Sequence, residues 1–94
     1  MSDWSFPDPK NTAVFSTEEV TSRNYPILYV SHDLDDGAWQ FHSGEEVRNS
    51  APKIVALYEI VQIDPSVNAL ADLPIGWIAT RKSPESPWRR SSVD

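Results

Sequence analysis

The fold of this chain is decided by residues 27–42, which read ILYVSHDLDDGAWQFH. The stretch begins with residues that favour β-strands, and polar and apolar residues then alternate as far as His42. Its middle, Asp35-Asp36-Gly37, has the chemistry of a turn, because short acids tolerate unusual backbone angles and glycine adopts a positive φ without strain. The pattern predicts a β-hairpin with strands at about 27–34 and 38–42.

The register of this hairpin follows from the length of its turn. If Asp36-Gly37 forms a two-residue turn, Leu34 lies opposite Trp39. A three-residue loop would instead place Asp33 beside Trp39 on the buried side, so we prefer the two-residue turn. One face of the hairpin then carries mostly apolar side chains, namely Leu28, Val30, His32, Leu34, Trp39 and Phe41. The other face is polar and carries Tyr29, Ser31, Asp33, Gln40 and His42.

The remaining elements are short. Residues 13–15 suggest a strand, Ser16 and Glu19 fit a capping box for a helix that reaches about Arg23, and Asp64-Pro65 is a helix start. Further periodic segments predict a strand at about 53–57, a helix at about 58–63 and a last strand at about 76–82. The class is therefore α+β: a small antiparallel or mixed sheet of four to five strands with the hairpin at its centre, covered on one face by two or three short helices.

The chain divides into three parts on composition. Residues 1–11 are expected to be an N-terminal arm, residues 12–82 a single domain and residues 83–94 a C-terminal tail rich in Pro, Ser and Arg. With 94 residues in all, the chain has the length of one domain.

Charge and composition exclude several classes of function. The formal net charge is −6, which argues against nucleic-acid binding, since that requires a basic surface. The chain has no cysteine, so disulfides and thiolate metal sites are excluded. No apolar run is long enough to cross a membrane, and the N-terminus has no signal-peptide pattern, so we expect a cytoplasmic protein. A basic protein partner would suit the acidic field.

The two histidines are the first candidates for chemistry. His32 and His42 point to opposite faces in the preferred register, so they cannot share a metal ion. The three glycines are too scattered for a phosphate loop, and there is no Gly-x-Ser-x-Gly motif. The sequence thus predicts no catalytic residue, no metal ligand and no cofactor. An alternative that stays open is a small ligand-binding domain or enzyme in which His32 or His42 acts with Asp33 in a pocket.

Acidic residues are the second candidates. Turn chemistry alone explains Asp35 and Asp36, and the spacing of the acids does not match a calcium loop. If they have a function, we expect them to present charge to a partner. A second surface, a docking edge, is suggested by Trp77, Arg81 and Trp88, because tryptophan and arginine are favoured at protein interfaces. The predicted partner-binding residues are Asp33, Asp35, Asp36, Glu45, Glu46, Trp77 and Arg81, while Asp72 is expected to cap a turn or to pair with Arg81.

The chain also resembles a known group of proteins. The strings Tyr29-Val30-Ser31-His32-Asp33 and Asp36-Gly37-Ala38-Trp39-Gln40-Phe41, followed by Ile63-Asp64-Pro65-Ser66 and the segment from Leu70 to Trp77, are similar to small bacterial domains of unknown function related to the immunity proteins of polymorphic toxin systems. The resemblance covers about residues 13–82 and departs from the pattern at Ala38, which separates Gly37 from Trp39. It implies an α+β fold and neutralisation of a toxin by surface binding, and it carries over no active site.

Three functions are therefore weighed. A protein-binding, immunity-like domain that acts through an acidic surface needs no catalytic constellation, so we favour it over an enzyme. It predicts an exposed patch of one charge sign next to an apolar contact surface. The alternatives are the ligand-binding domain or enzyme described above and an accessory domain that forms homo-oligomers through its aromatic residues.

Overall fold

The structure, a computed structural model, describes residues 4–44 and 52–92. Its elements follow the order β1 (Ala13–Thr17), α1 (Glu18–Arg23), β2 (Tyr29–His32), β3 (Trp39–His42), β4 (Pro52–Ala56), α2 (Leu57–Ile63), the 3-10 helix η1 (Pro65–Leu70), β5 (Trp77–Thr80) and β6 (Arg89–Ser92). The predicted α+β class is confirmed.

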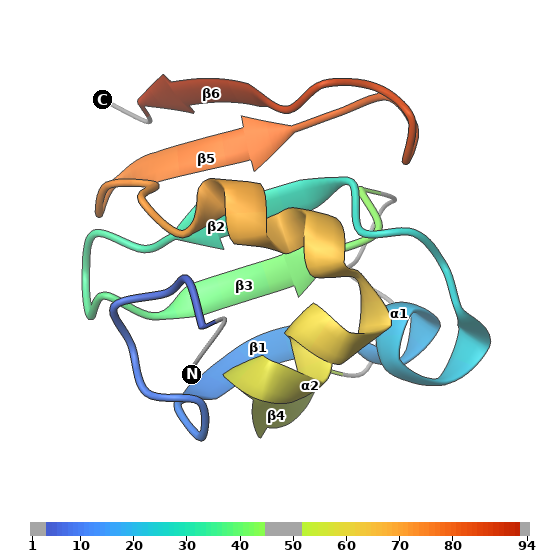
Figure 1. The fold of residues 1–94 in the computed structure, drawn as a ribbon, viewed down its shortest axis with the longest axis horizontal. Coiled ribbons are helices and arrows are strands. Elements are labelled where there is room, and N and C mark those ends of the chain that lie inside the picture. The colour runs from blue at the N-terminus through green and yellow to red at the C-terminus, as the bar shows by residue number, and fades with distance from the viewer. Residues whose placement is uncertain (1–3, 45–51, 93–94) are drawn as a thin grey trace.

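The strands form one mixed sheet in the order β4-β1-β3-β2-β5-β6. Strands β1 and β3 are parallel, and the other neighbouring pairs are antiparallel. Figure 1 shows α2 and η1 lying across one face of this sheet. The hairpin β2–β3 occupies the centre, with its loop at the end of the molecule opposite α1 (Figure 1).

The sheet has six strands in the described residues rather than the four to five predicted. The additional strand is β6, which pairs with β5 along the segment expected to be a tail. Its sequence, Arg-Arg-Ser-Ser, has no apolar alternation, and all four residues are exposed. Sequence periodicity cannot detect such a strand, because the pairing edge of β5 rather than a buried face holds it in place.

The predicted two-residue turn of the hairpin is wrong. His32 lies opposite Trp39 and Val30 opposite Phe41. A four-residue loop, 34–37, joins the strands: the amide of Asp33 donates to the carbonyl of Ala38 over 2.7 Å, and the amide of Gly37 donates to the carbonyl of Asp33 over 2.9 Å. The register is shifted by two residues, which leaves every strand side chain on its predicted face because the side-chain period is two.

Local signals place the helices with one correction. The N-cap of α1 is Thr17, whose side chain accepts a hydrogen bond from the amide of Val20. Ser16, the predicted cap, is instead buried in β1 and donates to the carbonyl of Phe41 over 2.8 Å. The Asp64-Pro65 start is confirmed, since Asp64 caps η1 by accepting from the amide of Ser66.

The hydrophobic core lies between the sheet and the covering helices. The sheet contributes Val30, Trp39 and Phe41, which are the inward residues of the central hairpin, and the helices contribute fully buried apolar residues, namely Leu57, Ile60, Val67 and Leu70. The N-terminal segment also packs here: Phe6 is buried and meets Trp39 edge-on at a ring-centroid distance of 5.3 Å. Apolar alternation on the hairpin and helical spacing on α2 thus converge on one core.

Candidate functional site

The face of the sheet opposite the core carries a polar side-chain network. Ser31 Oγ donates to Asp33 Oδ1 over 2.8 Å, and Gln40 Nε2 donates to Asp33 Oδ2 over 2.6 Å. His42 Nε2 lies 2.9 Å from Gln40 Oε1. Because the carboxylate only accepts, Gln40 turns its amide nitrogen to Asp33 and its oxygen to His42, so His42 donates from Nε2. In the neutral ring, Nδ1 therefore carries the lone pair.

His42 is held neutral by its surroundings. Burial lowers the pKa of His42 below its ordinary value of 6.5, and the negative charge of Asp33 opposes this shift. Its Nδ1 atom is buried and has no hydrogen-bond partner among residues 4–44 and 52–92. The ring of Tyr29, across the strand pair, lies 5.8 Å from the imidazole. Among the described residues, the only side-chain hydrogen bond of His42 is the one to Gln40, so none of their hydroxyl groups is aligned with the imidazole as a nucleophile.

Because His42 is buried, we expect the stability of the protein to depend on pH. Between its lowered folded pKa and 6.5, His42 binds more protons in the unfolded chain than in the folded one. The free energy of unfolding should therefore fall as the pH drops through 6.5 and level off below the folded pKa. Urea unfolding above and below this interval should show a larger loss for the wild type than for His42→Gln. Equal losses in the two proteins would contradict the assignment, because all other titrating groups are common to both.

A groove runs along this open face of the sheet, and we call it the open-face groove. Its volume is about 450 Å³. It is lined by Tyr29, Ser31, His32, Asp33, Leu34, Gln40, His42, Gly44, Gly76, Trp77 and Ile78. A second hollow of about 440 Å³ lies against Phe15, Thr17 and Pro52 and shares Asp33, Gln40 and His42 with the first. No lysine or arginine of the described segments lines either hollow.

The hairpin loop and the turn before β5 form a second feature, the hairpin tip, which we define as residues 34–37 with Ile75 and Gly76. The two loops pack together: a Cβ on Gly76 would lie 3.5 Å from Leu34 Cδ1, and a Cβ on Gly37 would lie 3.8 Å from Ile75 Cδ1. Leu34 is 61% exposed and Ile75 is 51% exposed. Asp35 and Asp36 are exposed beside them. The tip therefore presents two aliphatic side chains next to two acids.

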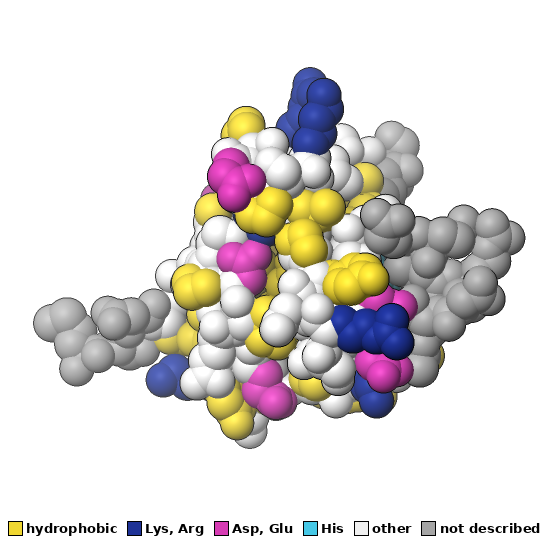
Figure 2. All heavy atoms as spheres, turned by 90° about the vertical axis from the view of Figure 1, so that its right-hand side faces the viewer, with side chains coloured by type: hydrophobic (Ala, Val, Ile, Leu, Met, Phe, Trp, Pro, Cys, Tyr) yellow, Lys and Arg dark blue, Asp and Glu magenta, His cyan; other side chains and the backbone are white. Residues whose placement is uncertain are grey.

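The opposite end of the molecule has a different character. Figure 2 shows the end that carries α1, where acidic and basic side chains lie next to one another with hydrophobic side chains between them. The hairpin tip contains acids and no lysine or arginine. The six residues of the hairpin tip thus carry negative charge only, whereas both charge signs are mixed at the α1 end.

The predicted acidic residues that the structure describes lie in two environments. Asp33 is half-buried in the polar network, whereas Asp35 and Asp36 are exposed in the loop. Asp36 Oδ1 accepts from the amide of Ala38 over 3.0 Å, which confirms a role in the turn. Glu45 and Glu46 lie outside the described residues. The acids placed by the structure therefore meet at one end of the hairpin.

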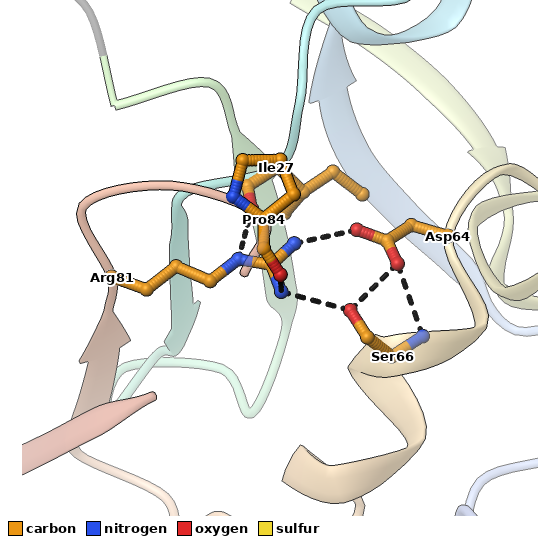
Figure 3. A network of polar contacts seen from close by, with 5 residues as sticks. All are labelled: Ile27, Asp64, Ser66, Arg81 and Pro84. Carbon is orange, nitrogen blue, oxygen red and sulfur yellow. Dashed lines mark hydrogen bonds and ion pairs between the residues drawn. The ribbon is translucent and has the colours of Figure 1, made fainter. Parts of the chain in front are cut away.

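The docking edge expected from Trp77, Arg81 and Trp88 does not form around Arg81. The Arg81 side chain is 2% exposed and pairs with Asp64 at 2.7 Å, whereas Asp72 pairs with Arg90. Figure 3 shows Arg81 reaching between strands and helix to Asp64, Ser66 and two backbone carbonyls. Trp77 is half-buried on β5 opposite His32, and the guanidinium of Arg81 lies 4.1 Å from the ring centre of Trp88. Arg81 is thus part of the interior.

The two histidine side chains point to opposite faces of the sheet, although both residues are among those that line the open-face groove. His32 faces the core, where it stacks on Trp39 with ring centroids 3.9 Å apart, and its Nδ1 lies 2.7 Å from the carbonyl oxygen of Leu73. His42 faces the opposite side of the sheet, as predicted. No group of three or more histidine, aspartate or glutamate side chains in the described residues could hold a metal ion. Asp33 and His42 both line the open-face groove, but they have no direct hydrogen bond and are linked through the side chain of Gln40.

The predicted partner-binding residues did not include four contributors to the polar network and the hairpin tip, namely Ser31, Leu34, Gln40 and Ile75. Leu34 was assigned to the buried face of a strand, yet it lies in the loop and is largely exposed. Gln40 was placed on the correct face, and the predicted register put it opposite Asp33. In the structure it lies opposite Ser31 and still bonds to Asp33 and His42, and these hydrogen bonds were not predicted. One signal in the sequence could have indicated the hairpin tip. Ile75 is an aliphatic residue between Pro74 and Gly76, and such turn residues predict that it is exposed.

No helix of the described segments is long and apolar enough to cross a membrane. No family model, no curated protein and no solved structure matches this chain.

Proposed function

We propose that this domain binds another protein through its hairpin tip. The observation that carries the proposal is the exposed pair Leu34 and Ile75 beside Asp35 and Asp36. Interface cores combine apolar anchors with surrounding polar residues, and the tip has this composition on a small scale. The acids favour a partner with a basic surface, since complementary charge accelerates encounter and excludes wrong partners.

The backbone supports the tip in a fixed shape. The hairpin loop is closed by the two backbone bonds of Asp33, and the amide of Gly76 donates to the carbonyl of His32 over 2.6 Å. Both loops are therefore tied to the central strands β2 and β3. A surface that is already ordered loses less conformational entropy on binding, which leaves more of the contact energy for affinity.

The resemblance to immunity-related domains fits the same proposal. Under it, the partner would be a toxin that is neutralised by coverage of its surface, and the domain would perform no reaction. The location in the cytoplasm stays a prediction of the sequence. The acidic balance of the whole chain, a net charge of −6, supports a basic partner of this kind.

Capture of proteins from the native lysate tests the proposal with matched variants. The double variant Leu34→Ser/Ile75→Ser removes the apolar pair. The control Tyr58→Ser/Ile63→Ser removes two side chains of α2 that are 43% and 42% exposed. A partner retained at low salt by the wild type and the control should be lost by the tip variant at least tenfold, as expected when interface anchors are truncated. Salt and Asp35→Asn/Asp36→Asn should weaken its capture further.

Equal retention by the tip variant and the control would contradict the proposal. The same conclusion would follow if no stoichiometric partner were captured at low salt. Circular dichroism of each variant shows whether the fold is kept. All three double variants change only exposed side chains, for which small stability effects are expected.

A further inference from the structure

The open-face groove is continuous with the hairpin tip. Leu34 and Gly76 belong to both, and from there the groove extends past Ser31 to Tyr29 and Gly44. Its volume of about 450 Å³ lies within the range of roughly 300–1,000 Å³ that is usual for ligand sites. A protein seated on the tip would therefore have one of its side chains within reach of the groove.

The polar end of the groove carries the negative charge of Asp33, and no lysine or arginine of the described residues pairs with it. Both oxygens of Asp33 accept hydrogen bonds from neutral groups, Ser31 Oγ and Gln40 Nε2. No ion pair joins Asp33 to a lysine or arginine of residues 4–44 and 52–92. A carboxylate offers about four acceptor positions, so one remains on each oxygen. Half-buried carboxylates normally gain a cation, and here a ligand can supply it.

The walls of the groove suit a long side chain with a planar charged head. Ile78 lies beside Ser31 on the neighbouring strand, and Leu34 and Tyr29 add apolar and aromatic surface. Arginine places a three-carbon stem on such surface while its guanidinium makes paired hydrogen bonds to a carboxylate. An anionic group would be repelled by Asp33, and it would find no lysine or arginine among the described lining residues.

We propose that the open-face groove receives an arginine side chain of the partner that docks on the hairpin tip, with its guanidinium bound to Asp33. This inference rests on the proposed function. Ser31 and Gln40 hold the carboxylate in place from both sides, and the aliphatic stem of the arginine lies against Leu34 and Ile78. The tip supplies the contact area, and the groove selects the residue.

The groove is tested with small probes that need no partner. N-acetyl-arginine amide is titrated into ¹⁵N-labelled protein, and the matched probe N-acetyl-citrulline amide has the same shape without the charge. The arginine probe should cause saturable shifts in β2 and β3 with a millimolar dissociation constant, and citrulline should bind at least tenfold more weakly, a difference of about 1.4 kcal/mol. The lysine analogue should bind more weakly than arginine, since it lacks the planar fork.

Two variants distinguish binding of the arginine probe in the groove from non-specific attraction to the negative charge of the protein. Asp33→Asn should weaken the arginine probe at least tenfold, whereas Asp35→Asn, which removes the same charge from an exposed position, should leave it within twofold. Equal binding of arginine and citrulline, equal binding of arginine and lysine, or equal effects of the two variants would each overturn the inference. The comparison of probes uses the wild type, so it decides the matter even if Asp33→Asn fails to fold.

The experiments distinguish a failure of the arginine-binding proposal from a failure of the proposed protein-binding function. Ile75→Ser lies outside the groove lining, so it should reduce partner capture and leave the arginine probe bound. If Asp33→Asn abolishes probe binding but leaves partner capture unchanged, the assignment of this arginine to the partner is wrong while docking on the tip stands. If the tip variants leave capture unchanged and the probe still binds through Asp33, the proposed function fails and the inference about the partner fails with it.

Discussion

Replacement of Arg81 by methionine is expected to remove about 3 kcal/mol of stability, which should lower the urea midpoint by roughly 1–3 M. The side chain is 2% exposed, and its guanidinium pairs with Asp64 at 2.7 Å. Its Nε donates to the carbonyl of Ile27 over 3.0 Å and its Nη1 to Ser66 Oγ over 3.0 Å. Methionine would leave Asp64 without its cation. Because Asp64 is 22% exposed, water compensates in part, and we expect the lower end of the usual range.

A matched pair of changes separates burial from charge. Arg90→Met breaks the other described arginine–aspartate pair, that of Arg90 with Asp72. The hydrogen bond from Arg90 lowers the pKa of Asp72, but this carboxyl is fully exposed, so water screens the pair and the midpoint should stay close to that of the wild type. The double variant Arg81→Met/Asp64→Asn should recover part of the loss, since Asn still caps η1 and carries no buried charge. Similar midpoints for Arg81→Met and Arg90→Met would refute the structural role of Arg81.

Truncation of Trp39 to alanine is the second large expected effect, a loss of about 3–5 kcal/mol. Trp39 is 1% exposed and lies in an aromatic group: it stacks on His32 at 3.9 Å, meets Phe6 edge-on at 5.3 Å and stacks on Phe41 at 6.0 Å. A domain of this size has a total stability of roughly 5–14 kcal/mol, so this one change should consume much of it. Thermal unfolding followed by circular dichroism measures the loss.

The indole nitrogen of Trp39 distinguishes the effects of two substitutions at this position. Its Nε1 is buried with no hydrogen-bond partner among the described residues. Trp39→Phe should therefore be much less damaging than Trp39→Ala, because phenylalanine keeps most of the ring contacts and removes an unsatisfied donor. Phe15→Ala, on the open face where the side chain is 36% exposed, is the control and should cost little. If Phe and Ala at position 39 were equally destabilising, ring packing would not be what Trp39 contributes.

The hairpin shows what an alternating sequence pattern can predict and what it cannot. Alternation along β2 and β3 placed Trp39 and Phe41 inside and Gln40 and His42 outside, and this assignment survived although the turn was wrong by two residues. A side-chain period of two cannot distinguish registers that differ by two. The loop length was set instead by the bonds of Asp33 and by the packing of Leu34 against Gly76 from the turn before β5.

The candidate site was predictable in its members and not in its connections. Asp33, His42 and the loop acids were named from their residue types, and His32 was correctly separated from His42. The order Ser31–Asp33–Gln40–His42 depends on which residues face one another across the strands. The exposed pair at the tip depends on two loops that are distant in sequence and meet only in the folded chain.

Local propensities and short periods were sufficient to predict the α+β class, the central hairpin, the faces of its side chains and the start of η1 at Asp64. The sixth strand, the four-residue loop and the burial of Arg81 depend instead on contacts between segments that are distant in the sequence. Strand β6 has no apolar face that a sequence pattern could reveal, and it is held in place by its pairing with β5. Arginine is normally a surface residue, yet Arg81 is buried because a carboxylate and backbone carbonyls from separate segments bind its guanidinium group. A buried cation is stable only where such partners meet, and chain topology brings them together.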